Sequence, residues 1–263
     1  MSISTLDGYI GAAKQVITWN KTTARTTVAA IPFSLFDVAG NPGAGTLSAG
    51  NTANGIVPTD ATAGYPAVNS FGGAIGYLSK VTFASPVACR FAIYDRVFSA
   101  GAYSFNSNVT LASQPSYSAR LPGTDYKGLE LWLEAVTAFT GNQSIAVTYT
   151  DQDGNASATT GTIATGVAPI IGRMLRLNLA AGDSGIQKVD SVVSSVATVG
   201  TFNVHVMRKL WEGRVPVANS GDTHDMLKTG LPQIYDTSAL FVMVTADSTS
   251  SSTPTCDMEI AYA

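Results

Sequence analysis

The residues with the clearest potential for metal chemistry are Asp151, Asp153 and Asn155, which are spaced D-x-D-G-N. This spacing is found at the start of calcium-binding loops, where a bidentate Glu completes the set at the twelfth position. Here the twelfth position is Thr162, so the EF-hand pattern fails. The segment is typical of a hairpin turn, with a surface calcium site completed by another strand as the alternative. We therefore predict no metal and no cofactor.

A second polar group, Asp222, His224 and Asp225, lies in the sequence GDTHD. A zinc or acid–base site usually adds a second His or a carboxylate from elsewhere, and the other histidine, His205, lies in an alternating segment. There is no G-x-S-x-G elbow, although the members of a catalytic triad need only meet in space. We expect a polar surface loop here.

Glu130 and Glu134 have the same parity on a predicted strand. Residues four apart on a strand are separated by about 13 Å, whereas the carboxyl pair of a glycosidase is ~5 to 9.5 Å apart. We interpret this pair as part of a solvated face or a subunit contact. Cys89 and Cys256 lie outside any CxxC pattern and are predicted to be buried free thiols, with a disulfide between them as the alternative. With no catalytic residue to assign, we predict that the protein is not an enzyme.

The elements that would position these residues occur twice in the chain. Leu121 to Thr150 and Leu231 to Tyr262 share the order Leu-Pro, a Tyr and Asp pair, an apolar segment, Val-Thr-Ala or its equivalent, a polar turn and a final segment ending near Tyr. The offset between matching residues stays between 108 and 113. A nearly constant offset over about thirty residues indicates an internal duplication. Lys80 and Lys188 extend the match upstream.

Alternation of apolar and polar residues predicts β-strands in both copies. In the first copy the apolar residues recur at every second position from Leu129 to Ala135, and again from Ile145 to Tyr149, as on half-buried antiparallel strands. In the second copy, 239–245 is apolar on both parities. We therefore expect that strand to be covered on both faces, by a second sheet or by a partner chain.

The predicted fold is all-β, with two tandem, duplicated β-sandwich or jelly-roll-like units and a short N-terminal helical arm. The arm is assigned to residues 1–20, the first unit to 21–150, with a long loop at 46–76, and the second unit to 151–263. The pattern leaves open whether the two units form separate sandwiches or share sheets.

Four residues are candidates for contacts with other subunits: Leu6, Ile10, Tyr65 and Phe71. Leu6, Ile10 and Ala13 form one stripe of a short helix, which is too short to be stable alone in water. It packs either on its own domain or on a neighbour. Tyr65 and Phe71 lie in the loop 46–76, which is too long for an ordinary connection and is predicted to lie ordered against another subunit.

Composition narrows the function classes. Charged residues make up 13% of the chain, about half the usual ~25%, while hydrophobic residues make up 45%. Such a surface suits a protein packed against neighbours. The net charge is −3 with no basic cluster, which disfavours nucleic-acid binding. Neither a signal-peptide pattern nor an apolar run of about 18 residues is present, so we expect a non-secreted protein that does not insert into membranes.

Five stretches of the chain contain no chemical motif but are informative together: Phe36 to Leu47, Val57 to Gly73, Leu121 to Asn142, Val147 to Asn155 and Leu177 to Val189. Through these stretches the chain resembles a family of structural proteins encoded by tailed bacteriophages. The family provides no catalytic residues to assign.

The resemblance implies a virion component made in the host cytoplasm, most simply a decoration or cement protein on the capsid. Its partners would be the major capsid protein and copies of itself, as a trimer or another symmetric oligomer. The alternative is a tail or fibre component that binds a host-surface glycan, with Trp132 and Tyr126 as the aromatic residues to inspect. A third interpretation is a hydrolase of host surface polymer, for which the carboxylate and histidine candidates above are weak.

Overall fold

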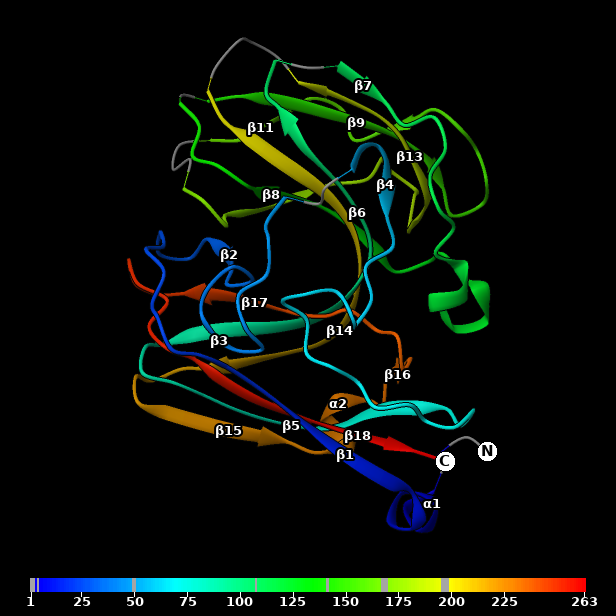
Figure 1. Cartoon of the computed structure of the whole chain (residues 1–263), viewed down its shortest axis with the longest axis vertical. Helices are drawn as coiled ribbons and strands as arrows, with labels where there is room; N and C mark the ends of the chain where they lie inside the picture. The colour runs from blue at the N-terminus through cyan, green and yellow to red at the C-terminus, as the bar shows by residue number, and fades with distance from the viewer. Residues whose placement is uncertain are drawn as a thin grey trace.

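The computed structural model describes residue 3 and residues 5–48, 51–106, 108–140, 142–166, 170–194 and 199–263, and these are nearly all strand and turn. Every strand pair is antiparallel (Figure 1). None of the helices in the described ranges has the length and apolar character needed to span a membrane. The elements are α1 (Leu6–Gly11), β1 (Ala13–Lys21), β2 (Pro32–Ser34), β3 (Gly40–Asn41), β4 (Asn51–Ile56), β5 (Gly76–Ser85), β6 (Cys89–Ser104), β7 (Asn108–Thr110), η1 (Ser118–Arg120), η2 (Pro122–Thr124), β8 (Leu129–Ala135), β9 (Ser144–Asp151), β10 (Ala158–Thr159), β11 (Ile163–Ala164), β12 (Met174–Leu177), β13 (Ile186–Ser194), β14 (Thr201–Val215), β15 (Ser220–His224), α2 (Met226–Thr229), β16 (Gln233–Ile234), β17 (Leu240–Ala246) and β18 (Thr255–Tyr262).

A central sheet runs between two outer sheets. Its strand order is β12-β8-β14-β6-β17-β2, with β4 also paired to β6. One outer sheet has the order β15-β5-β18-β1-β3 with β16 beside β5, and the other has the order β10-β9-β13-β7 with β11 beside β9. In Figure 1 the outer sheets lie at opposite ends of the molecule, and the curved strands β6 and β14 extend from one end to the other.

Each outer sheet covers its own apolar core. The lower core in Figure 1 draws its side chains from 17–93 and 210–260, and the upper core draws them from 97–206. The cores are thus divided near the middle of β6 and β14. The predicted division at residues 150 and 151 falls instead at the end of β9, inside the upper core. Strands from both predicted units share sheets, which answers the question that the sequence left open.

The long strands reach both cores because their register shifts midway. In β14, Val204 and Val206 pack in the upper core, whereas Trp211 and Val215 pack in the lower core. The pairing with β6 is irregular between Val206 and Met207 and again before Trp211. A β-bulge adds one residue to one strand, so the alternation of faces changes parity there.

The duplication governs the strand order as well as the sequence. Copy one supplies β5, β6, β8 and β9, and copy two supplies β13, β14, β17 and β18, each of which begins 110 to 112 residues after its equivalent. Read from one end, the central sheet begins β12-β8-β14, and read from the other end it begins β2-β17-β6. The equivalent strands β8 and β17, and likewise β14 and β6, therefore occupy matching positions. In the outer sheets β9 pairs with β13, and β18 pairs with β5. Each copy therefore completes sheets with the other copy.

The strand predictions in both copies are confirmed. β9 alternates strictly, with Ile145, Val147 and Tyr149 buried. β17 is buried on both faces, and residues of this chain pack against each face. Leu240 and its same-face neighbours join the lower core, while Phe241 and Met243 join a third cluster with Phe36 and Trp132.

The N-terminal helix is present, but the arm is shorter than predicted. α1 ends at Gly11, and β1 begins at Ala13, which was expected to continue the helical stripe. β1 pairs with β18 over eight residues, from Ala13 opposite Tyr262 to Asn20 opposite Thr255. Residues 13–20 are therefore part of an outer sheet, because β18 offers them a complete antiparallel partner.

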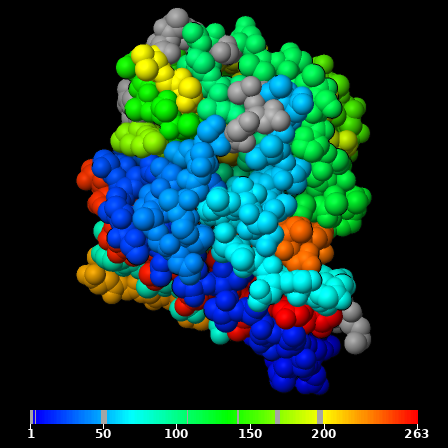
Figure 2. Space-filling view, viewed as in Figure 1, coloured from blue at the N-terminus to red at the C-terminus, as the bar shows by residue number. Residues whose placement is uncertain are grey.

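The long segment 46–76 packs on its own chain, and its contact with another subunit stays a prediction. It contains β4, and it crosses the middle of the face shown in Figure 2. The Tyr65 ring lies 4.7 Å from the Phe36 ring, and the Phe71 ring stacks on Tyr262 at 5.0 Å. Both side chains are buried. Tyr65 and Phe71 are therefore core residues of this chain, since its own aromatic residues already cover them.

Candidate functional site

A buried charged layer separates the two cores where β6 and β14 cross from one to the other. The Asp95 carboxylate forms an ion pair with Arg120 and lies 3.6 Å from the Arg208 guanidinium. It also accepts hydrogen bonds from Ser238 Oγ at 2.9 Å and from the Ala239 backbone N–H at 3.1 Å. The carboxylate is fully buried and surrounded by donors, so it is an element of the framework and not an open site.

On the opposite face of β6, Glu134 is the acceptor of a second buried network. Its Oε2 accepts from Arg96 at 3.4 Å and from His205 Nε2 at 2.9 Å, while Ser99 Oγ lies 2.8 Å from His205 Nδ1. A neutral His205 satisfies both contacts, donating from Nε2 and accepting at Nδ1. Burial lowers the pKa of His205 to about 4, with the Arg96 charge acting in the same direction.

Glu134 itself stays ionised. Burial by itself would raise its pKa, but the charge of Arg96 and the hydrogen bond from His205 outweigh burial and lower the pKa to about 2. The sequence placed Glu134 on a solvated face or in a subunit contact, and this was wrong. The alternation of β8 was correctly predicted, but its second face is covered by β6 residues and the segment around Phe36.

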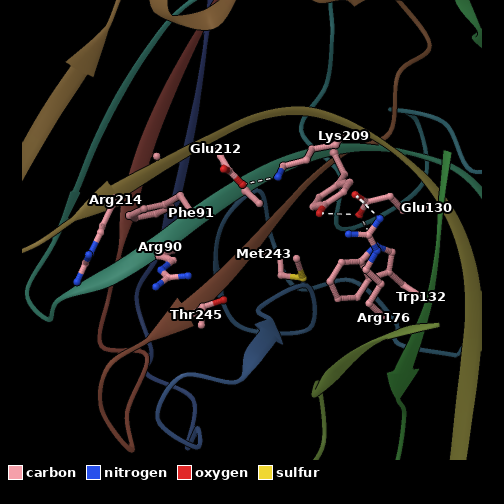
Figure 3. A pocket seen from close by; sticks show the side chains of 13 residues that line it. Arg90, Phe91, Glu130, Trp132, Arg176, Lys209, Glu212, Arg214, Met243 and Thr245 are labelled. Carbon is pink, nitrogen blue, oxygen red and sulfur yellow. Dashed lines mark hydrogen bonds and ion pairs between the residues drawn. The ribbon is translucent and has the colours of Figure 1, made fainter. Parts of the chain in front are cut away.

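A concave surface lies on the same face of the central sheet, beside this network. It has a volume of about 500 Å³ and is lined by 13 residues from β6, β8, β12, β14 and β17 (Figure 3). Six of the 13 are charged, in a chain with only 13% charged residues, and four of these six are cations. We call this surface the central groove.

One end of the central groove is built around Glu130. Its Oε2 accepts hydrogen bonds from Tyr94 Oη at 3.0 Å and from Trp132 Nε1 at 2.8 Å, and its Oε1 lies 3.3 Å from Arg176. Burial raises the pKa of Tyr94, and the neighbouring Glu130 carboxylate raises it further, so the phenol remains a donor. These contacts fix the carboxylate and both aromatic rings in place.

The other end of the central groove carries two arginines side by side. Arg90 on β6 is directly opposite Arg214 on β14, and Thr245 is the partner of Arg90 on its other side. Figure 3 shows both guanidinium groups at the end away from Trp132. Arg214 lies 3.9 Å from Asp247, and no described carboxylate lies within ion-pair distance of Arg90. Between the two ends, Lys209 pairs with Glu212.

The central groove continues into a smaller hollow. This hollow has a volume of about 330 Å³, and it shares Glu130 and Arg176 with the central groove. It extends along β12 toward Asp183 and Ser184. An extended ligand could therefore contact both hollows, with the Arg176–Glu130 pair between them.

The metal and catalytic candidates from the sequence do not assemble into a site. Asp151 accepts hydrogen bonds from the backbone of Asp153 and Asn155 within its own turn, as the hairpin interpretation predicts. Within the described ranges, no group of three or more His, Cys, Asp and Glu side chains could hold a metal ion. Cys89 and Cys256 are free and buried, so the prediction of free thiols is confirmed.

The GDTHD segment forms β15 and the cap of α2. His224 Nε2 lies 3.3 Å from Asp222, and its Nδ1 accepts from Trp211 Nε1 at 3.1 Å. Asp225 accepts from the backbone N–H groups of Leu227 and Lys228 as the N-cap. His205 is buried elsewhere, in the network with Glu134, so the two histidines do not form one centre.

The remaining predicted residues differ in their accessibility. Leu6 and Ile10 are 59% and 65% exposed, in contrast to Tyr65 and Phe71. Trp132 lines the central groove, whereas Tyr126 packs edge-on against Tyr117 outside it. The sequence did not identify Arg90 and Arg214, because residues this far apart in the chain become neighbours only through the pairing of β6 with β14.

Comparisons with known proteins add little. No family model matches the chain, and no curated protein matches it. Among solved structures, the VP2 subviral particle of infectious bursal disease virus is 10% identical over 95% of this chain and 80% of that one, with a TM-score of 0.20. The structure of the Gt strain of that virus is 11% identical over the same shares, with a TM-score of 0.18. TM-scores this low carry no argument about fold or function.

Proposed function

We propose that this protein is a non-enzymatic structural subunit of a virus particle, and specifically a decoration protein on the head of a tailed bacteriophage. The observation that carries the proposal is the N-terminal helix α1, which has no buried residue. A helix of six residues is unstable by itself in water, so it depends on contacts with other elements or chains.

Within the described residues, α1 contacts its own chain through Tyr9, which packs against a small apolar cluster with Ala12 and Ala261 and also forms polar contacts. Tyr9 Oη donates a hydrogen bond to Glu259 at 2.7 Å, and Lys14 Nζ donates to the carbonyl of Tyr9 at 2.8 Å. Leu6 and Ile10 are four residues apart and therefore share a face of the helix, and this face is exposed. Val16 on the adjoining strand is exposed as well. We infer that a neighbouring subunit covers this apolar patch of Leu6, Ile10 and Val16.

Two features of the sequence support the same proposal. The low charge content suits a protein whose surface is largely covered by neighbours, and the resemblance to structural proteins of tailed bacteriophages suggests the setting. Association through the apolar patch with copies of itself and with the major capsid protein would add contact area to the shell. A closed ring, such as a trimer, would bury the patch of each copy in an equivalent way.

The copy number in purified virions tests where the protein acts. A decoration protein is expected in numbers close to those of the major shell protein, because only the shell offers so many equivalent sites. A few copies per particle would favour the alternative of a tail or fibre component. Absence from the particle would overturn the structural role.

A double variant tests the apolar patch. Leu6→Ser with Ile10→Ser should reduce binding to particles that lack the protein, because it removes apolar surface from the contact. The matched control is Val217→Ser, since Val217 is 64% exposed and precedes Ser220, which pairs with the end of β5 opposite to the one beside Tyr262. Equal binding of both variants would show that α1 is not the contact.

A further inference from the structure

We propose that the central groove binds an acidic saccharide, with a carboxylate of the sugar held between Arg90 and Arg214. This binding activity goes beyond the structural role proposed above and does not depend on it. The argument begins with the pairing of β6 with β14, which places two cations directly opposite each other.

The arginine pair lacks a close anionic partner among the described residues. Like charges directly opposite on neighbouring strands repel each other. The described carboxylates relieve this repulsion only weakly: Asp247 is 3.9 Å from Arg214, its side chain is 46% exposed, and it does not reach Arg90. Guanidinium groups bind carboxylates through two parallel hydrogen bonds, so a ligand carboxylate at this end of the groove would pair with these arginines.

The rest of the central groove suits hydroxyl groups better than a second anion. Glu130 and Glu212 would repel a densely anionic ligand, whereas sugar hydroxyls can donate to carboxylates and accept from cations. Glu130 is already fixed by Tyr94, Trp132 and Arg176, and its Oε1, which faces only Arg176, keeps a lone pair for a ligand. A preorganised acceptor of this kind costs little to order on binding.

The floor of the groove is apolar, and Met243 and Trp132 expose 5% and 6% of their surfaces there. Met243 and Trp132 lie on neighbouring parts of this face, and the ring of Tyr94 packs edge-on against Trp132 at 6.0 Å. Apolar lining with a few fixed polar groups is the usual character of a ligand site. The adjoining hollow beyond Arg176 lengthens the surface, which favours an oligomer of several sugars over a single one.

Calorimetric titration of the full chain with a galacturonic acid oligomer tests this proposal. We expect saturable binding to the wild type, weakened about tenfold or more in the double variant Arg90→Gln with Arg214→Gln, because charge-assisted hydrogen bonds are lost. The control is Lys188→Gln with Lys228→Gln, which changes the net charge equally on β13 and α2, outside the groove. The control variant should bind like the wild type.

Three comparisons separate the possible ligands. A galactose oligomer of the same length should bind much more weakly, because it lacks the carboxylate. Equal binding of poly-glutamate would assign the groove to an acidic peptide and overturn the saccharide proposal. Equal binding of sulfate alone, equal weakening in the lysine control, or no binding of the galacturonic acid oligomer would also overturn it. Unchanged melting temperatures of the variants would show that the loss of binding is not a loss of folding.

Discussion

At the scale of single residues, the charged side chains of this protein fall into two groups, one that is buried in the framework and one that is accessible on the surface. Asp95 and Glu134 are completely buried and hold β6, β8 and β14 together, whereas Arg90 and Arg214 remain accessible on the same sheet. The sequence does not show which of these charges are buried and which are accessible. Only the pairing of strands distant in sequence decides which charge receives a partner.

Replacement of Asp95 by Ala should destabilise the protein strongly. The change leaves the guanidinium groups of Arg120 and Arg208 buried without their carboxylate, and breaking a buried ion pair in this way costs about 3–5 kcal/mol. Urea denaturation measures the loss. The control, Asp247→Ala, removes a carboxylate 3.9 Å from an exposed arginine and should change the free energy of unfolding by about 0.5 kcal/mol or less. Similar losses in the two variants would contradict this account.

Acidification should destabilise the fold in two stages. The pKa of His205 in the folded state is about 4, below its ordinary 6.5, so its contribution is complete above pH 6.5 and is lost as the pH falls toward 4. The pKa of Glu134 is about 2, below its ordinary 4.5, so its contribution is lost as the pH falls from 4.5 toward 2. The melting temperature should therefore decrease from pH 7 to pH 5, and further below pH 4.5.

Two histidine variants identify the group responsible for the first stage. His205→Gln should lose most of the dependence between pH 6.5 and pH 4, because glutamine does not titrate there. His224→Gln, which changes the half-buried histidine of β15, should retain that dependence. A steep dependence that persists in His205→Gln would assign it to another group.

At the scale of elements, local patterns in the sequence identified the strands better than the loops. Alternation in β9 and continuous apolarity in β17 are direct consequences of how many faces each strand buries, so both were predictable. The segment 46–76 has no periodicity, since its order comes from individual contacts such as Tyr65 on Phe36. β1 was missed as a strand because its partner β18 lies at the other end of the chain.

Gly64 provides a test of how segment 46–76 is held in place. Its φ of +96° disfavours other residues, and a Cβ there would lie 2.5 Å from Gly45 Cα. Gly64→Ala should therefore cost about 1–3 kcal/mol and accelerate proteolysis within the segment. Gly72→Ala is the matched control, because Gly72 also has a positive φ but has open space around its Cβ position. Equal effects of the two changes would show that the close approach to Gly45 is unimportant.

At the scale of the whole molecule, the two cores depend on each other. β6 and β14 contribute side chains to both, and the buried Asp95 and Glu134 networks lie between them. A chain of this length would often unfold in more than one step. Here we expect a single transition in scanning calorimetry, with equal calorimetric and van't Hoff enthalpies. Two resolved transitions would show that the cores unfold separately.

The sequence predicted the duplication and the all-β class, because both depend on local alternation and on a repeat with a constant offset. The sharing of sheets between copies required the long-range pairing of β9 with β13 and of β5 with β18. The central groove lay beyond sequence reasoning for the same reason, since its lining comes from five strands. Two of its members were singled out from the sequence, Trp132 as an aromatic residue and Glu130 for its spacing from Glu134, and neither was chosen for its neighbours.

The reciprocal pairing of the two copies is what duplication and fusion of a half-length gene would produce. A half-length polypeptide with the equivalents of β2, β5, β6, β8 and β9 would contain one half of every strand pair in the duplicated framework. Two such polypeptides, each lending its last strands to the other, would assemble as an intertwined homodimer with these sheets. Fusion of the two genes would then join the partners after β9, and each half could afterwards diverge. Segment 46–76, which only the first half carries, is the clearest product of that divergence.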